Sequence, residues 1–147
     1  NSIGGWQKGD VLIVNFGAHY LSKEDGLEDI QTDFSVLFET LADIPKDDVT
    51  IFWREYAPAH FRKTHNGEFP LDKKHIEVLR ICGPHRKMAP SEVNEIASAA
   101  IQDCGARCEH IRQIKIWDLM KDAWDQHAES THRDCRHFLM PGPIEYW

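Results

Sequence analysis

The chain has 147 residues with 17 Lys+Arg and 24 Asp+Glu, which gives a formal net charge of −7, and 41% of its residues are hydrophobic. A chain of this length and composition can bury a single hydrophobic core, which argues against disorder and fibrous repeats. The acidic balance argues against nucleic acids and anionic membrane surfaces as main partners, because phosphate binding needs clustered Lys and Arg. The longest apolar run, Val11 to Val14, is too short to span a bilayer.

No targeting segment is visible, and the chain begins at Asn1 rather than at a methionine. We therefore expect it to be a piece of a longer protein whose targeting sequence lies upstream. The four cysteines, Cys82, Cys104, Cys108 and Cys135, permit two disulfides without requiring any. Although His110 follows Cys104 and Cys108, the CxxC pairs of a zinc ribbon are absent, so structural cysteines are favoured over metal ligands.

The first half of the chain predicts one βαβ unit. Asp10–Asn15 is a continuous apolar, β-branched run typical of a buried strand. Apolar residues at intervals of three and four predict an amphipathic helix over Leu27–Leu41, with Pro45 beyond its end. Val49–Trp53 is a second β-rich run, which a helical crossover would place parallel to the first. The Pro- and Gly-rich stretch Glu55–Pro90 is expected to be a long, partly ordered loop.

The second half predicts a helix, a strand and a short helix. Ser91 is a candidate N-cap, and the helix that follows it ends at Gly105. Ile111–Trp117 is a candidate third strand, and Leu119–Trp124 begins a last short helix. The order β-α-β-loop-α-β-α predicts an α/β layer fold with a parallel sheet.

Three strands are few for such a sheet, which agrees with the expectation that part of the domain is missing. Open α/β folds place their sites beyond the carboxyl ends of the strands. We expect residues 15–20, residues 54–61 and the tail after residue 117 to converge there.

Asp134 and His137 in that tail have a spacing that lets the carboxylate reach the imidazole. A carboxylate bound to one ring nitrogen fixes the tautomer and leaves the other nitrogen able to take a proton from a nucleophile. The chain contains nine histidines, so this spacing arises easily by chance, and a surface hydrogen bond is the alternative interpretation.

Three ordered blocks of sequence span almost the whole chain. Residues 134–147 read Asp-Cys-Arg-His-Phe-Leu-Met-Pro-Gly-Pro-Ile-Glu-Tyr-Trp, and match the pattern D-C-x-H-[FWY]-x-x-P-G-x-x-[DE]-x-W at nearly every defined position. Residues 9–20 resemble G-D-V-[LIV]-x-x-N-x-G-x-H, and residues 51–61 resemble F-x-R-x-x-x-P-x-H-F. These are the blocks of the PC-esterase family of trichome-birefringence-like polysaccharide O-acetyltransferases, which the chain therefore resembles.

The resemblance implies an SGNH-hydrolase-like, three-layer α/β/α domain, of which residues 1–147 would be the C-terminal portion without the nucleophile strand. It implies that His137 is the base, that Asp134 orients it, and that the Asn15 side-chain amide donates to the oxyanion. One such donor is typically worth about 3 kcal/mol of transition-state stabilisation. A turn-forming role at a strand end is the alternative for Asn15.

Three further residues match positions that the resemblance places beside the site. The candidate substrate-binding residues are Arg54, His60 and His19. A structural role is the alternative for each of them: pairing with an acid for Arg54, a backbone bond for His60, and a structural role of the same kind for His19. Ala18 separates His19 from the preceding glycine, unlike the spacing in some relatives. A second cysteine after the phenylalanine of the last block is absent, so the family's disulfide pattern does not carry over directly.

No Gly-Asp-Ser motif occurs in the 147 residues, so the nucleophilic serine is expected upstream. The leading hypothesis is Ser-His-Asp acyl transfer, of acetyl above all, to or from polysaccharide hydroxyls. The alternatives are a carbohydrate esterase that uses water as acceptor and a non-catalytic carbohydrate-binding relative. A metal hydrolase built on His127, His132 and His137 is a remote fourth, because a spacing of five does not share a helical face.

The expected partners and location follow from the resemblance. No metal is expected, and acetyl-CoA is one candidate acetyl donor. The acceptor would be a polysaccharide, and no nucleic-acid partner is expected. Relatives act in the Golgi lumen, usually held by an N-terminal transmembrane segment that these residues do not include.

Overall fold

The computed structural model describes residues 5–17, 20, 26–61, 82–84, 91–127 and 134–138. A parallel sheet of order β1-β2-β3 is built from β1 (Asp10–Val14), β2 (Val49–Arg54) and β3 (Ile111–Ile114). In its register Leu12 lies beside Ile51, and Ile51 lies beside Ile111. The prediction of an α/β fold with a parallel sheet is confirmed.

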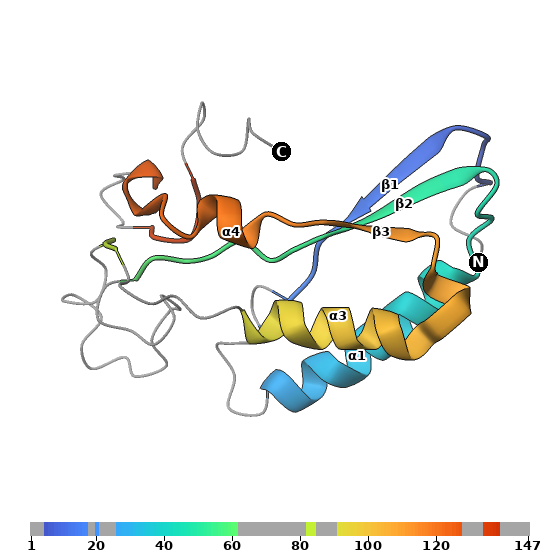
Figure 1. The fold of residues 1–147 in the computed structure, drawn as a ribbon, viewed down its shortest axis with the longest axis horizontal. Helices are drawn as coiled ribbons and strands as arrows, with labels where there is room; N and C mark the ends of the chain where they lie inside the picture. The colour runs from blue at the N-terminus through green and yellow to red at the C-terminus, as the bar shows by residue number, and fades with distance from the viewer. Residues whose placement is uncertain are drawn as a thin grey trace.

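Two long helices, α1 (Gly26–Ala42) and α3 (Glu92–Cys104), lie side by side along one face of this sheet (Figure 1). Their apolar positions are buried at helical spacing, among them Ile30, Phe34 and Phe38 on α1. The Trp53 indole of β2 meets both phenylalanine rings edge-on, with ring centroids 5.1 and 5.6 Å apart. The hydrophobic core therefore lies between the helices and the sheet.

The strands alternate between the core and the opposite face. On β2, Val49, Ile51 and Trp53 are buried toward the helices. On β1, Leu12 packs against the same core, whereas Val11 and Ile13 are 61% and 59% exposed. The face of β1 that points away from α1 and α3 is therefore apolar and open to solvent.

A glycine after β1 allows a close approach to both helices. Gly17 is buried and has a φ of 112°, a value that residues with a Cβ rarely adopt. A Cβ built there would lie 2.7 Å from Val93 Cγ1 and 3.0 Å from Ile30 Cδ1. Any larger residue would push the segment after β1 away from α1 and α3.

The predicted boundaries hold to within one residue for the first two strands and for α1 and α3, but not after Ile114. The strand predicted over Ile111–Trp117 ends at Ile114. The last helix, predicted over Leu119–Trp124, is instead α4 (Trp117–Met120), and the short 3-10 turn η5 (Trp124–Gln126) follows it. Glu55 caps the start of α4: its Oε2 accepts the backbone N–H groups of Ile116 and Trp117 at 2.8 and 2.9 Å. The sequence around residues 111–117 could not predict this cap, because the carboxylate comes from the residue that follows β2.

The predicted ends of α3 lie where the sequence placed them. Ser91 occupies the N-cap position, but its buried hydroxyl makes no hydrogen bond. Gly105 ends the helix with a φ of 60° and opens the 3-10 turn η4 (Gly105–Cys108). None of the helices in the described ranges is long and apolar enough to cross a membrane.

All four cysteines form disulfides, which agrees with the structural interpretation of them. Cys104 bonds to Cys108 across η4, and Cys82 bonds to Cys135 across a sequence separation of 53 residues. The second bond joins the middle of the chain to the segment that carries Asp134 and His137.

Candidate catalytic dyad

The chain after β2 forms the support on which the candidate site rests. Glu55 continues the ladder for one more bond, with its N–H donating to the Ile114 carbonyl at 3.0 Å. The buried Asn94 side chain of α3 then holds the Tyr56 backbone twice: its Oδ1 accepts the Tyr56 N–H at 2.7 Å, and its Nδ2 donates to the Tyr56 carbonyl at 3.0 Å. The Asn94 side chain thereby satisfies the two backbone groups that a neighbouring strand would otherwise pair.

Further along, this extension binds the C-terminal loop directly. The His60 N–H donates to the Cys135 carbonyl at 2.8 Å, and the Gly83 N–H donates to the His60 carbonyl at 3.1 Å. Phe61 forms an antiparallel bridge with Cys82, which is itself bonded to Cys135. Main-chain bonds and a disulfide therefore fix residues 134–138 against the extension of β2, as the expected convergence of these segments requires.

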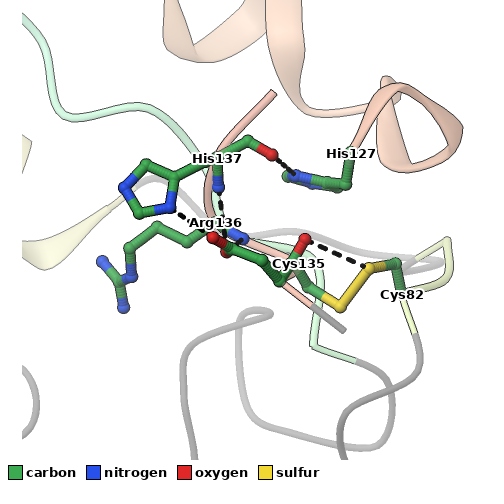
Figure 2. A network of polar contacts seen from close by, with 6 residues as sticks. Cys82, His127, Cys135, Arg136 and His137 are labelled. Atoms are coloured by element: carbon green, nitrogen blue, oxygen red, sulfur yellow. Dashed lines mark hydrogen bonds and ion pairs between the residues drawn. A yellow bond between two sulfur atoms is a disulfide. The ribbon is translucent and has the colours of Figure 1, made fainter. Parts of the chain in front are cut away.

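Figure 2 shows the His137 ring on this loop, and Asp134 is the hydrogen-bond partner of that ring. His137 Nδ1–H donates to Asp134 Oδ2 in a short hydrogen bond. The other carboxylate oxygen, Oδ1, accepts the backbone N–H groups of Arg136 and His137 at 2.9 and 3.1 Å. One carboxylate thus shapes the turn and orients the imidazole, so that Nε2 is left as the basic atom of the ring.

The environment of the dyad keeps Asp134 charged. Partial burial raises the pKa of Asp134, but the hydrogen bonds from the His137 ring and from the Arg136 and His137 N–H groups together outweigh it and hold that pKa below its ordinary value. The Asp134 side chain is 33% exposed and the His137 side chain 78% exposed. The His137 imidazole is therefore exposed to solvent, whereas the Asp134 carboxylate that binds it is largely covered.

The residue between them, Arg136, points back to the fold. Its guanidinium donates a short hydrogen bond to the Tyr56 hydroxyl and lies 5.5 Å from the centroid of that ring. Because Tyr56 is buried and its backbone is held by Asn94, this contact ties the loop to α3 as well.

Asn15 and Arg54 lie at the ends of neighbouring strands, as the topology predicts. The Asn15 Nδ2 donates to the carbonyls of Arg54 and Glu55 at 3.0 and 3.3 Å. Both amide hydrogens are therefore used to hold the ends of β1 and β2 together. Arg54 is half-buried, and burial lowers the pKa of its guanidinium.

His60 makes the backbone bond that was the alternative to substrate binding for this residue. Its side chain is fully buried, and its Nε2 donates to the Lys121 carbonyl at 2.9 Å. A backbone bond of this kind was the alternative to substrate binding, and a ring with no exposed surface does not present itself to a sugar. His19 lies outside the described residues.

His127 is the residue that the sequence considered only as a remote metal ligand. It is 3% exposed, its Nε2 lies 2.7 Å from His60 Nδ1, and its Nδ1 donates to the His137 carbonyl at 3.0 Å. Among the residues that the structure describes, no group of three or more His, Cys, Asp or Glu side chains is placed to hold a metal ion. His132, the third member of that hypothesis, lies outside those residues.

An open depression of about 310 Å³ lies between α3 and Glu55, the residue that follows β2. It is lined by Glu55, Asn94, Glu95, Ser98, Ala99 and Gln102. Neither Asp134 nor His137 contributes to it, so the structure gives no link between this depression and the dyad.

Comparisons with known proteins give no match: no family model, no curated protein and no solved structure is significantly similar to the chain. The assignment of roles to these residues therefore depends on their geometry and on the resemblance of the sequence blocks.

Sequence reasoning missed three residues that build the site's support: Glu55, Asn94 and His127. Asn94 carried a usable signal, because it is a polar residue beside Val93 on the helix that packs against the core. Glu55 acts through a contact with residues more than 60 positions away in the sequence, and His127 acts through a contact with a loop 10 positions away. Local sequence patterns do not encode either contact.

Proposed function

We propose that this chain is part of an acyl-transfer domain that moves an acetyl group to or from a polysaccharide hydroxyl. The observation that carries the proposal is the exposed His137 imidazole whose Nδ1 is bound to the partly covered Asp134 carboxylate. This is the arrangement that prepares a histidine to accept a proton at Nε2. The family resemblance supplies the substrate class.

In the proposed reaction a serine hydroxyl from a Gly-Asp-Ser motif outside the 147 residues attacks the acyl carbonyl. His137 Nε2 takes the hydroxyl proton as the Oγ–C bond forms. It returns that proton to the leaving atom of the donor, an oxygen for an ester or the sulfur for a thioester such as acetyl-CoA, as the bond from that atom to the acyl carbon breaks. Asp134 stays ionised and stabilises the imidazolium. In the second half, an acceptor hydroxyl repeats the attack on the acyl-serine, and His137 passes its proton to the serine oxygen.

The proposed architecture is the three-layer SGNH-like domain. Its support is the apolar surface formed by Val11 and Ile13 on the side of the sheet away from α1 and α3. Parallel sheets are almost always covered on both faces, and side chains of this kind suit a covered position.

A secretory location, with the Golgi lumen as the specific proposal, is supported by the two disulfides. Disulfides persist in oxidising compartments and are rare where thiol reductants are abundant. A neutral sugar polymer as acceptor also suits a chain whose net charge is −7.

The test uses the full-length protein with an acetyl donor and a panel of plant and algal polysaccharides, and it scores acetate on sugar against free acetate. Asp134→Asn is the informative variant, because the amide oxygen can still accept the Arg136 and His137 N–H groups. Its NH₂ would meet His137 Nδ1 and reverse the tautomer, and the loss of such a carboxylate lowers the rate about 10⁴-fold. His137→Ala removes the base itself.

His110→Ala is the matched control, because it removes a histidine that has no contact with the dyad in the described structure. Full transfer by this control and loss of transfer in both dyad variants supports the proposal. Near wild-type transfer by folded Asp134→Asn and His137→Ala proteins would contradict it. Free acetate in place of acetylated sugar would move the assignment from transferase to esterase.

A further inference from the structure

The buried ring pair of His60 and His127 makes three hydrogen-bonding contacts in a row. His60 Nε2 meets the Lys121 carbonyl at 2.9 Å, His60 Nδ1 meets His127 Nε2 at 2.7 Å, and His127 Nδ1 meets the His137 carbonyl at 3.0 Å. The row runs from the end of α4 to the main chain of the proposed base, with the His127 end of it visible in Figure 2.

Counting hydrogens along this row gives a definite charge. A carbonyl oxygen only accepts, so His60 Nε2 and His127 Nδ1 must each carry a hydrogen. The two remaining nitrogens would then both be acceptors in neutral rings, and two lone pairs would face each other at 2.7 Å. The central contact is a hydrogen bond only if a third hydrogen lies between the rings. Two neutral imidazoles carry two.

We propose that His60 and His127 share one extra proton, as a buried imidazole–imidazolium pair, and that this cation positions the loop that carries Asp134 and His137. The proton count stands independently of the proposed function. The positioning role rests on the proposed function.

Several groups around the pair are suited to a positive charge. The two carbonyl oxygens at its ends point their negative dipole ends at ring N–H groups. The Phe138 ring stacks on His127 with centroids 4.2 Å apart, and meets His60 edge-on at 6.1 Å. Asp134 supplies a nearby negative charge, which raises the pKa of His127.

Burial acts in the opposite direction. It is the largest influence on the pKa of His127 and lowers it, and a protonated His137 would lower it further, whereas the bond to the His137 carbonyl and the charge of Asp134 raise it. Among the neighbours that the structure describes, Lys121 is paired with Asp118, and Cys82 is in a disulfide. The geometry, with three contacts that need three hydrogens, favours the charged pair over the neutral one.

Removal of the shared proton would break the row at one place. Two neutral rings can keep at most two of the three hydrogen bonds, so the pair must give up the central bond or turn one ring away from its carbonyl. The His137 carbonyl is one of those two acceptors. Deprotonation of the pair therefore weakens the row of contacts that ends on the main chain of the proposed base, whichever of the three bonds is lost.

Nuclear magnetic resonance of the nitrogen-15-labelled chain, with its disulfides intact, tests the proton count from about pH 4 to about pH 9. The expected result is three protected ring N–H signals from His60 and His127, with a coupling across the hydrogen bond between His60 Nδ1 and His127 Nε2. His60→Gln and His127→Gln should each abolish that coupling, and His110→Gln should leave it unchanged. Only two ring N–H signals at every pH at which the wild-type chain is folded would overturn the proposal, even if neither Gln variant folds.

The positioning role is tested in the full-length protein by the pH dependence of acyl transfer. His127→Gln keeps both residues of the dyad, Asp134 and His137, in the sequence. The expected result is a lower rate of acyl transfer and the loss, from the pH profile of that rate, of the step that coincides with titration of the His60–His127 pair. An unchanged rate and pH profile in folded His127→Gln protein would overturn the positioning role. An inactive wild-type protein would instead refute the proposed function, and the spectra would still decide the proton count.

Discussion

The Cys82–Cys135 disulfide gives the most direct test of how the candidate site is held. The perturbation is the double variant Cys82→Ala/Cys135→Ala, and the matched control is Cys104→Ala/Cys108→Ala. Each removes two sulfur atoms, and each includes one fully buried cysteine, since Cys135 and Cys108 are 0% and 1% exposed. The two variants differ in the length of chain that the bond closes.

The magnitude follows from that length. In the chain-entropy model, a bond across 53 residues removes about 14 cal/mol/K from the unfolded chain, or about 4 kcal/mol at 25 °C. A bond across 4 residues removes about 6 cal/mol/K, or about 2 kcal/mol. We therefore expect the first variant to lose about 2 kcal/mol more of the free energy of unfolding than the second.

The assay is equilibrium unfolding in guanidinium chloride, followed by circular dichroism and tryptophan fluorescence for wild-type and both variants. Coincident transitions by the two probes establish that a single free energy can be compared. An equal loss in the two variants, or a larger loss for the Cys104–Cys108 pair, would refute the argument that the longer bond stabilises the fold by restricting the unfolded chain.

Three further predictions concern single side chains. Asn94→Leu should cost about 2 to 4 kcal/mol of unfolding free energy, because it leaves the buried Tyr56 N–H and carbonyl unpaired. Asn94→Asp should also lose stability, because it keeps the acceptor for the Tyr56 N–H but places a carboxylate oxygen opposite the Tyr56 carbonyl. Chemical denaturation measures both losses, and a loss under about 1 kcal/mol for the Leu variant would contradict the role of Asn94 in holding the Tyr56 backbone. The pKa of Asp134 is lowered in the folded state, so the contribution of this carboxylate to stability is present above its unfolded pKa of 3.8 and is lost as the pH falls through the folded pKa. Asp134→Asn should therefore reduce the fall in unfolding free energy at acid pH, as measured by denaturation curves at a series of pH values. An unchanged fall would argue against a stabilising role for the Asp134 carboxylate. The hydrogen bond to Asp33 raises the pKa of Tyr20 to about 12, so ultraviolet titration should show one tyrosine ionising late, and Asp33→Asn should return it toward 10.0.

Local sequence patterns predicted most of the fold. The apolar periodicity of α1 placed its ends within one residue, and Gly105 marked the end of α3. The prediction failed after Ile114, where the strand pattern continued but the strand ended and the Glu55 carboxylate bound the N–H groups at the start of α4. The difference is physical: periodicity records which face a residue buries, whereas this cap depends on a side chain that only the folded sheet brings near.

The candidate site was predictable to a smaller extent. The spacing of Asp134 and His137 indicated their contact, because a carboxylate and an imidazole three residues apart can meet within one turn. The loop's attachment to the rest of the fold was not predictable, since the His60–His127 contact joins residues 67 positions apart. Cysteine counting allowed two bridges but could not choose the partner of Cys135.

The position of Cys135 between Asp134 and His137 makes the assembly of the dyad a late event in the life of the chain. On a ribosome, the partner of Cys82 emerges only after β3 and α4 have been synthesised, so the cross-link cannot form before the sheet and both long helices are available. Among the cysteines of the 147 residues, an oxidant that acts early would find only Cys104 and Cys108 available to pair with Cys82. The protein would then depend on disulfide isomerisation to place the base, and its yield of active molecules would report on the folding machinery of its compartment.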